Sequence, residues 1–281
     1  MKSWKMINWL GQILLFWWLD RLMATLFVLL FYPLTRIFCK VKVVGKENFP
    51  RSGRIMLIAD HPSFIGIFVV VIAIFWPWVL APGKLSMIPA VLAKTTYKPL
   101  WWILALRFNI FGVSPDKRKR SQAVRAVINY LNSRINCVLL NFAAGTRNEA
   151  GQEGLPQVNP GVGRTLVETE PLLVLVNDVG SGKVWPKGKM FPGWQWRKWH
   201  GISIPCRTEV TIYISKPLDT AADPESGIFK VSSGKPFDEC GQPVADYLRL
   251  LFEVWRVSHQ SINQAAEIPG YEKVVYDLCL L

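Results

Sequence analysis

The sequence lacks the signals that mark several common protein classes. Its five cysteines stand far apart and form no Cys-x-x-Cys pair, so we expect reduced thiols in a cytosol-facing protein and no metal site. No Gly-x-Ser-x-Gly motif is present, which argues against a serine hydrolase. RRM, KH and zinc-finger signatures are also missing, and we expect no nucleic-acid partner.

Charged residues are few, at 19%, and their balance is one-sided. Lys and Arg number 33 against 20 Asp and Glu, which gives a formal net charge of +13. Hydrophobic residues make up 51% of the chain, mean hydropathy is +0.21, and there are 13 tryptophans. This is more apolar than an ordinary cytosolic enzyme. The combination favours an anionic bilayer as partner, so we expect a membrane-associated protein on the cytoplasmic face of the inner or plasma membrane.

Residues 1–39 are a candidate for the membrane-associated segment. Two apolar runs lie here, separated by Asp20 and Arg21, and neither offers the roughly 20 uninterrupted residues that a spanning helix needs. The pattern fits a pair of helices in one leaflet, and a single tilted transmembrane helix is the alternative. No small-residue cleavage site marks a signal peptide. We predict that residues 40–281 form one α/β domain, because they contain no internal repeat and no dividing linker.

The stretch Asp60-His61-Pro62-Ser63 follows an apolar run at 54–58 that predicts a buried strand. Pro62 ends the strand, and Ser63 can cap an apolar helix predicted over 64–75 and stopped by Pro77. Open α/β sheets place ligands and chemistry at the carboxyl ends of strands, beside helix N-termini. His61 is therefore a candidate catalytic residue; a structural histidine is the alternative.

A second apolar strand, from 138, runs into the turn Gly145-Thr146-Arg147. Such a turn exposes backbone donors, and the guanidinium of Arg147 suits bidentate phosphate binding. Together the two stretches resemble the glycerol-phosphate and lysophosphatidic-acid acyltransferase superfamily, whose first motif is Asn-His-x-Ser-x-x-Asp and whose third is Phe-Pro-Glu-Gly-Thr-Arg. The matching residues, in order, are His61, Ser63, Phe142, Gly145, Thr146 and Arg147.

The resemblance implies an O-acyltransferase of phospholipid metabolism that needs no cofactor. Its fold would be a mixed, largely parallel sheet flanked by helices. His61 would be the general base for the hydroxyl of a lysophospholipid, which attacks the thioester of acyl-CoA or an acyl-carrier protein. The implied substrate-binding residues are Ser63, Lys117, Arg118, Gly145, Thr146 and Arg147. Lys117 and Arg118 are the nearest matches to the basic residue of the second motif, and a solvated helix start is the alternative for this charge run.

Two positions depart from the motifs. Gly66 stands where the family has its aspartate, and Ala144 where it has its glutamate. In the family the aspartate orients the histidine and stabilises the imidazolium. Asp60 is the candidate replacement, but neighbours on an extended chain point to opposite faces, so the turn at Pro62 would have to redirect it.

The departures leave a second interpretation open. A catalytically weak or inactive relative would bind acyl-CoA or lysolipid as an accessory or sensor protein. The changes at Gly66 and Ala144 would be natural divergence or inactivating substitutions, and the sequence alone fits both.

Further elements follow from apolar periodicity. Strands are predicted at 40–45, 108–114, 171–176 and 209–218, and helices at 99–106, 121–134, 164–170 and 244–265. Residues 148–163 and 180–201 are predicted loops. The second of these interleaves basic residues with four tryptophans, which favours a headgroup layer over single-stranded nucleic acid.

Overall fold

A computed structural model describes residues 29, 31–33, 35–79, 86–89, 91–92, 112–113, 117–145, 148, 154–188, 192–199, 202–220, 237–259 and 262–271. Its centre is a mixed sheet with the strand order β1-β10-β7-β2-β6-β3, in which β11 also pairs with β7. The strands are β1 (Cys39–Val44), β2 (Arg54–Ala59), β3 (Ser86–Pro89), β6 (Cys137–Phe142), β7 (Leu172–Val179), β10 (Thr208–Ile214) and β11 (Leu218–Asp219). The pairings of β10 and β11 with β7 are antiparallel, and the others are parallel. The predicted mixed, largely parallel sheet is confirmed.

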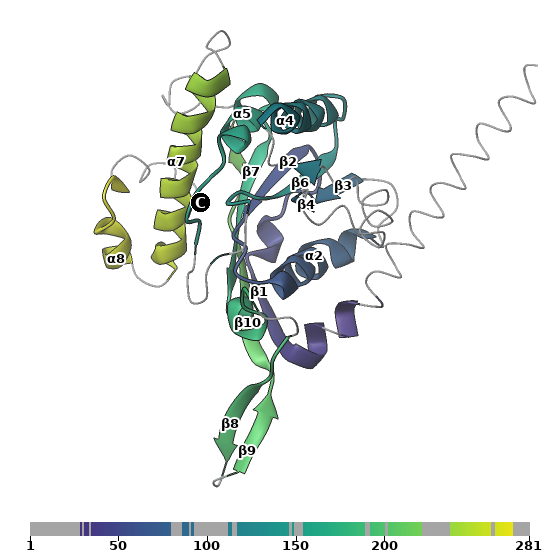
Figure 1. The fold of residues 1–281 in the computed structure, drawn as a ribbon, viewed down its shortest axis with the longest axis vertical. Coiled ribbons are helices and arrows are strands. Elements are labelled where there is room, and N and C mark those ends of the chain that lie inside the picture. Colours follow the sequence, from purple (N-terminus) through teal and green to yellow (C-terminus); the bar gives the residue numbers. More distant parts are fainter. Residues whose placement is uncertain are drawn as a thin grey trace, which may run out of the picture.

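Two short pairs lie outside this sheet. Strands β4 (Val91–Leu92) and β5 (Gly112–Val113) pair in parallel, and β8 (Gln195–Trp199) forms an antiparallel hairpin with β9 (Ile202–Cys206). The hairpin projects from the body of the molecule (Figure 1).

Helices cover both faces of the sheet (Figure 1). On one face lie α2 (Phe64–Val79) and the short α6 (Ser181–Val184); on the other lie α4 (Lys117–Asn132), α5 (Pro160–Thr169), α7 (Phe237–Ser258) and α8 (Ile262–Ala266). A 3-10 turn, η1 (Lys46–Asn48), follows β1.

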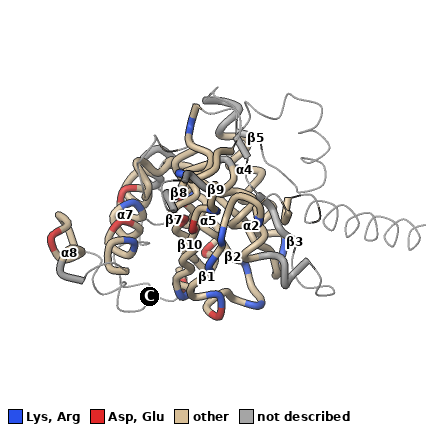
Figure 2. The backbone as a smooth tube through the Cα atoms, turned by 90° about the horizontal axis from the view of Figure 1, so that it is seen from below, with Lys and Arg blue, Asp and Glu red and all other residues tan. Residues whose placement is uncertain are grey.

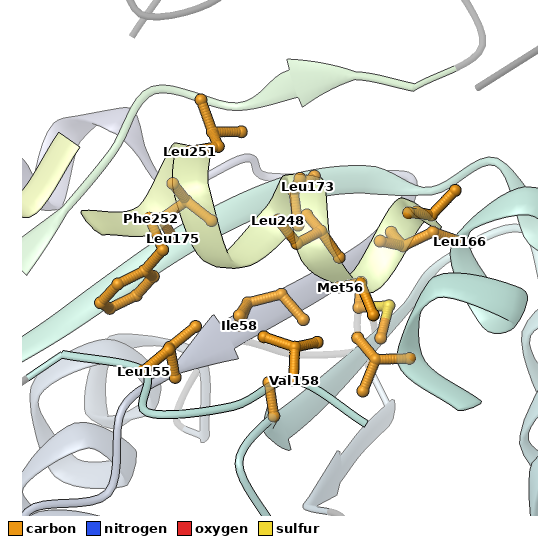
Figure 3. Packing of buried hydrophobic residues seen from close by; sticks show 14 of the residues in the cluster. Met56, Ile58, Leu155, Val158, Leu166, Leu173, Leu175, Leu248, Leu251 and Phe252 are labelled. Carbon is orange, nitrogen blue, oxygen red and sulfur yellow. The ribbon is translucent and has the colours of Figure 1, made fainter. Parts of the chain in front are cut away.

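Alternation along the strands divides the apolar core into two layers. In β2, Met56 and Ile58 join the cluster beneath α5 and α7, which Figure 3 shows with Leu248 and Phe252 of α7. Ile55, Leu57 and Ala59 join the cluster beneath α2. Because each strand of the sheet centre is buried on both sides, it reads in sequence as an unbroken apolar run.

Several predicted boundaries were wrong. Helix α2 continues past Pro77, and α5 begins at Pro160 rather than at 164, because proline suits the first helical position. Helix α4 begins at Lys117, four residues before its predicted start, so the charge run is the first turn of this helix. Helix α7 begins at Phe237 and includes Pro243, since its packing on the sheet outweighs the lost backbone bond.

Other predictions differ in extent or cannot be compared. Strand β7 runs to Val179, three residues beyond the predicted end, and the predicted loop 180–201 contains α6 and β8. The predicted helix at 99–106 and the strand residues 108–111 lie outside the described residues.

Most of the predicted membrane segment, residues 1–28, also lies outside the described part of the chain. Residues 31–33 and 35–38 are helical. Within the described ranges, no helix combines the length and the apolar character needed to cross a bilayer.

Candidate functional site

The structure brings the two motif stretches together. Strands β2 and β6 are parallel neighbours with Ala59 opposite Phe142, so the residues that follow each strand emerge at the same edge of the sheet. There the ring of His61 packs on that of Phe142, with centroids 4.6 Å apart. The backbone amide of Asn148, just after the third motif, donates to the carbonyl of His61 at 2.9 Å. The structure thus places the first and third motif stretches next to each other.

Ser63 links this edge to α2 and α6. Its Oγ accepts the amide hydrogen of Gly66 at 3.1 Å, as an N-cap side chain does in the first turn of a helix. The same hydroxyl donates to Oγ of Ser181 in α6 at 2.9 Å. Ser63 and Ser181 are fully buried, so the hydrogen bonds of both hydroxyls are made within the protein.

Asp178, near the end of β7, completes the buried polar chain. The hydroxyl of Ser181 donates to Oδ2 of Asp178 at 2.5 Å. The amide of Asp178 donates to Oδ1 of Asp60 at 2.7 Å. Asp60 and Asp178 are 1% and 2% exposed, so two carboxyl groups lie buried, one in the residue before His61 and one near the end of β7.

Burial shapes the protonation of these groups. Loss of solvation, followed by the charge of Asp178, raises the pKa of Asp60 well above its usual value. Loss of solvation raises the pKa of Asp178 from 3.8 to about 7, against the opposing effect of its hydrogen bonds with Ser181. The pKa of the nearby Cys39 thiol rises to about 12 for the same two reasons, burial first and then Asp178. One of the two carboxyl groups therefore holds a proton easily near neutral pH.

Asp60, the predicted partner of His61, belongs by strand alternation to the face of the sheet that α7 covers. Along β2 the even-numbered Met56 and Ile58 point towards α7, and the charge of Arg256 in α7 acts on the Asp60 carboxyl. Its Oδ1 is bonded to the backbone of Asp178, and its Oδ2 has no hydrogen-bond partner in the part of the chain that the structure describes. Asp60 thus supports the strand end of β7.

The other predicted residues are described to different degrees. Gly145 has φ of +70° in a turn whose amide returns to the carbonyl of Phe142 at 2.8 Å. Ala144 is buried, and its carbonyl accepts from the amide of Gln157 at 3.2 Å. Thr146 and Arg147 lie outside the described residues; for Lys117 and Arg118 only the backbone, in the first turn of α4, is described.

Asp178 was not among the predicted site residues, because it lies far from His61 in the chain. A signal was present. The apolar run of β7 ends in Asn177-Asp178, just as that of β2 ends in Asp60-His61. Two parallel strands that each end in polar residues place those residues at one edge of the sheet.

A depression of about 510 Å³ lies at the opposite edge. It is lined by residues at the amino ends of the strands and the turns before them, among them Gly53, Arg54, Ile135 and Leu172. None of the motif residues that the structure describes lines it, so the candidate site is defined by its side chains rather than by this hollow.

Comparisons with known proteins find a similarity to solved structures only. Neither the models of known families nor the curated protein sequences match the chain. Among solved structures, it is similar to the crystal structure of the 1-acyl-sn-glycerophosphate (LPA) acyltransferase PlsC from Thermotoga maritima. The two are 19% identical, the match covers 75% of this chain and 72% of that one, and the TM-score is 0.46.

Proposed function

We propose that this protein is a membrane-associated O-acyltransferase that moves an acyl chain from a thioester to the hydroxyl of a lysophospholipid. One observation carries the proposal: the contact between His61 and Phe142 joins the first and third motifs at one edge of the sheet. Residues 40–281 would be the acyltransferase-like domain, and residues 1–39 its membrane-associated helices.

The proposed reaction needs no protein nucleophile. His61 takes the proton from the acceptor hydroxyl as its oxygen attacks the thioester carbonyl. The tetrahedral intermediate then collapses: the C–S bond breaks, the new ester C–O bond remains, and the thiolate receives the proton from the imidazolium. His61 suits this role because it follows β2 at the edge of the sheet where the two motifs meet, and 8% of its surface stays exposed.

The substrate roles of the other motif residues belong to the same proposal. Gly145 supplies a turn with φ of +70°, and Thr146 and Arg147 would continue it around the acceptor phosphate. Lys117 and Arg118 would add positive charge from the start of α4. The donor would be acyl-CoA or an acyl-carrier protein.

An anionic bilayer on its cytoplasmic side is the proposed site of action. Trp196 on β8 is 65% exposed, and the nearby Trp194 packs on Phe38 with ring centroids 4.9 Å apart. Arg207, at the base of the hairpin, donates to the carbonyl of Arg36 at 3.4 Å. The hairpin and residues 35–38 thus form one surface with exposed aromatic and basic groups, which suits a headgroup layer.

Basic residues also mark the adjoining sheet edge. Lys40 and Lys42 are exposed on the edge strand β1, and Figure 2 shows basic positions on this side of the molecule, whereas α7 carries both signs. Lys40 lies 3.1 Å from Glu209, a pair that is too exposed to add much stability. This edge would add attraction to anionic lipid next to the hairpin surface.

The test is acyl transfer by the full-length protein in detergent, from a radiolabelled acyl thioester to a panel of lysophospholipids. We expect an ester product from at least one acceptor and its loss in His61→Ala. His259→Ala is the matched control, because His259 packs on Tyr213 and Trp255 outside the motif edge. Product formation that survives His61→Ala would remove the proposed base.

A binding protein is the second candidate, favoured by the missing motif carboxylates at Gly66 and Ala144. Its signature would be saturable binding of acyl-CoA or lysolipid without transfer to any acceptor. The same panel, run with equilibrium dialysis of the labelled thioester, separates the two candidates.

A further inference from the structure

The space beside Gly66 is already filled by a carboxylate. A Cβ built on Gly66 would lie 2.3 Å from Oδ2 of Asp178 and 3.0 Å from Oγ of Ser181. Real Cβ atoms essentially never approach another atom as closely as 2.3 Å. Gly66 of helix α2 has no side chain, and the carboxylate of Asp178 from strand β7 occupies the space that a side chain at position 66 would need.

The pairing of β2 with β7 brings Asp178 level with His61. The two strands are parallel, with Ile58 opposite Leu175 and Ala59 opposite Val176. Continued for two residues, this register sets His61 opposite Asp178. The amide of Asp60 still donates to the carbonyl of Val176, at 3.4 Å, so the strands remain adjacent beyond the last pair.

Both side chains also belong to the same face of the sheet. In β7, Val174 and Val176 join the cluster beneath α2, and alternation gives Asp178 the same face. His61 follows Ala59 of that cluster by two residues and packs on Phe142 of the same cluster. Asp60 has the opposite parity, so of the two buried carboxyl groups Asp178 is the one on the face of His61.

The carboxyl of Asp178 is held in place but not fully used. The hydroxyl of Ser181 donates a hydrogen bond to Oδ2 of Asp178, and the hydroxyl of Ser63 donates to that of Ser181. The backbone amide of Asp178 donates to Oδ1 of Asp60. Oδ1 has no hydrogen-bond partner among the residues that the structure describes. Fixing one oxygen and leaving the other for an imidazole is what an orienting carboxylate requires.

We propose that Asp178 is the positioning residue of His61, taking the place of the motif aspartate that Gly66 replaces. The inference rests on the proposed function for its catalytic meaning, but the effect of Asp178 on the pKa of His61 can be measured without it. During transfer Asp178 would orient the imidazole and stabilise the imidazolium. The residue would act through His61 and would not touch the substrate.

The kinetic test is a relocation of the carboxylate in the full-length protein. We expect Asp178→Asn and Asp178→Gly to lower kcat by about 10²- to 10⁴-fold with little change in KM, as loss of an orienting carboxylate does. Gly66→Asp alone should also be impaired, because its Cβ meets Oδ2 of Asp178 at 2.3 Å. The double variant Gly66→Asp/Asp178→Gly should regain at least about tenfold over Asp178→Gly, since it restores the motif arrangement. Asp246→Asn, an exposed carboxylate of α7, is the matched control.

A second measurement is independent of turnover. The chain has 3 histidines, so NMR of histidine-labelled protein can follow the imidazole of His61, assigned with His61→Gln. Removing an adjacent carboxylate disfavours the imidazolium, so the pKa of His61 should fall by about one pH unit or more in Asp178→Asn. Asp178→Asn preserves the volume of the side chain and one of its acceptor oxygens, and circular dichroism checks its fold.

The outcomes separate the two proposals. An inactive wild-type protein whose His61 pKa still falls in Asp178→Asn would support the positioning contact and refute acyl transfer. Active wild-type protein with an unchanged His61 pKa, or with full activity in Asp178→Gly, would overturn the role of Asp178. If the kcat of the double variant is no higher than that of folded Asp178→Gly, the proposal that Asp178 takes the place of the motif aspartate is overturned.

Discussion

The backbone amide of Asn148 donates to the carbonyl of His61 at 2.9 Å, which ties the segment after the third motif to the predicted base. The side chain of Asn148 continues the tie, because its Nδ2 donates to the carbonyl of Gly154 at 2.9 Å. His61 and Gly154, the two residues that Asn148 contacts, are both buried. The loop that follows the motif is thus anchored at two points from one residue.

Asn148→Ala is therefore expected to destabilise the protein. It keeps the backbone bond to His61 but leaves the buried carbonyl of Gly154 without this donor, a loss of about 1–3 kcal/mol in the free energy of unfolding. Denaturant unfolding measures it. Asn132→Ala removes an amide that is also hydrogen-bonded but exposed, and should change stability by less than about 0.5 kcal/mol. Equal losses for the two variants would contradict the anchoring role.

Gly180, between β7 and α6, should tolerate no side chain. It has φ of +102°, and a Cβ there would lie 2.3 Å from the carbonyl oxygen of Glu209. Gly180→Ala is expected to cost about 1–2 kcal/mol for the backbone conformation and about 1–3 kcal/mol more for the clash. Because Ser181 and Asp178 flank this position, kcat should fall as well.

Gly188→Ala isolates the conformational part of that cost. Gly188 has φ of +89° but nothing within 4 Å of a built Cβ. We expect only the smaller loss, about 1–2 kcal/mol, and no effect on kcat. Thermal unfolding of both variants gives the comparison, and a Gly188→Ala loss as large as that of Gly180→Ala would show that the clash is unimportant.

The pH dependence of stability should reveal the buried carboxyl of Asp178. Its folded pKa is raised from 3.8 to about 7, so the folded state binds more protons than the unfolded state between these values. Stability is therefore lost as pH rises through this window, by up to about 1.4 kcal/mol for each pH unit. Asp178→Asn should reduce the slope, because the buried Asp60, whose pKa is also raised, still titrates. The variant should gain stability relative to wild type as pH rises from about 4 to about 7. Parallel stability curves for the two proteins would rule out this titration.

Arg147→Ala should weaken binding of the acceptor more than that of the donor. A guanidinium that holds the acceptor phosphate as a bidentate partner is worth about 1.5–3 kcal/mol, or roughly 10- to 100-fold in KM for the lysolipid. Steady-state kinetics with each substrate varied in turn measures the difference. Arg164→Ala, which breaks an ion pair with Glu168 within α5, is the control. Equal effects of Arg147→Ala on both substrates would remove its phosphate-binding role.

Trp196→Glu should impair action at a bilayer but not the chemistry. A charge on the exposed hairpin opposes insertion among headgroups, so activity on lysolipid in anionic vesicles should fall several-fold, whereas activity on a monomeric short-chain acceptor should not. Ile135→Glu is the control, because Ile135 is 86% exposed at the opposite edge of the sheet. A loss on both substrate forms would point to damage of the fold.

The motif strands could be predicted from the sequence because local composition determines them. Strands β2 and β6 are buried on both faces and read as apolar runs that end in polar turns. The contact of His61 with Phe142 shows that the two stretches meet, and local composition does not reveal which strands are neighbours.

Asp178 could not be predicted in the same way, because its role depends on strand register. Local reading ended the strand at 176, whereas β7 continues to Val179 and carries Asp178 to the level of His61. The filled space at Gly66 is a contact between residues 112 positions apart in the chain, and only the folded arrangement reveals it. The hairpin of β8 and β9 was missed for a simpler reason: its tryptophan and basic residues resemble a loop when no partner strand is known.

The central claim is tested most directly by the stoichiometry of one reaction. Wild-type protein is incubated with an acyl thioester and the preferred lysophospholipid, and free thiol and new ester are measured together. We predict equal amounts of the two, both dependent on the acceptor and both lost in His61→Ala. Thiol released without ester would indicate hydrolysis, and the absence of both products with every acceptor would contradict the proposed acyl transfer.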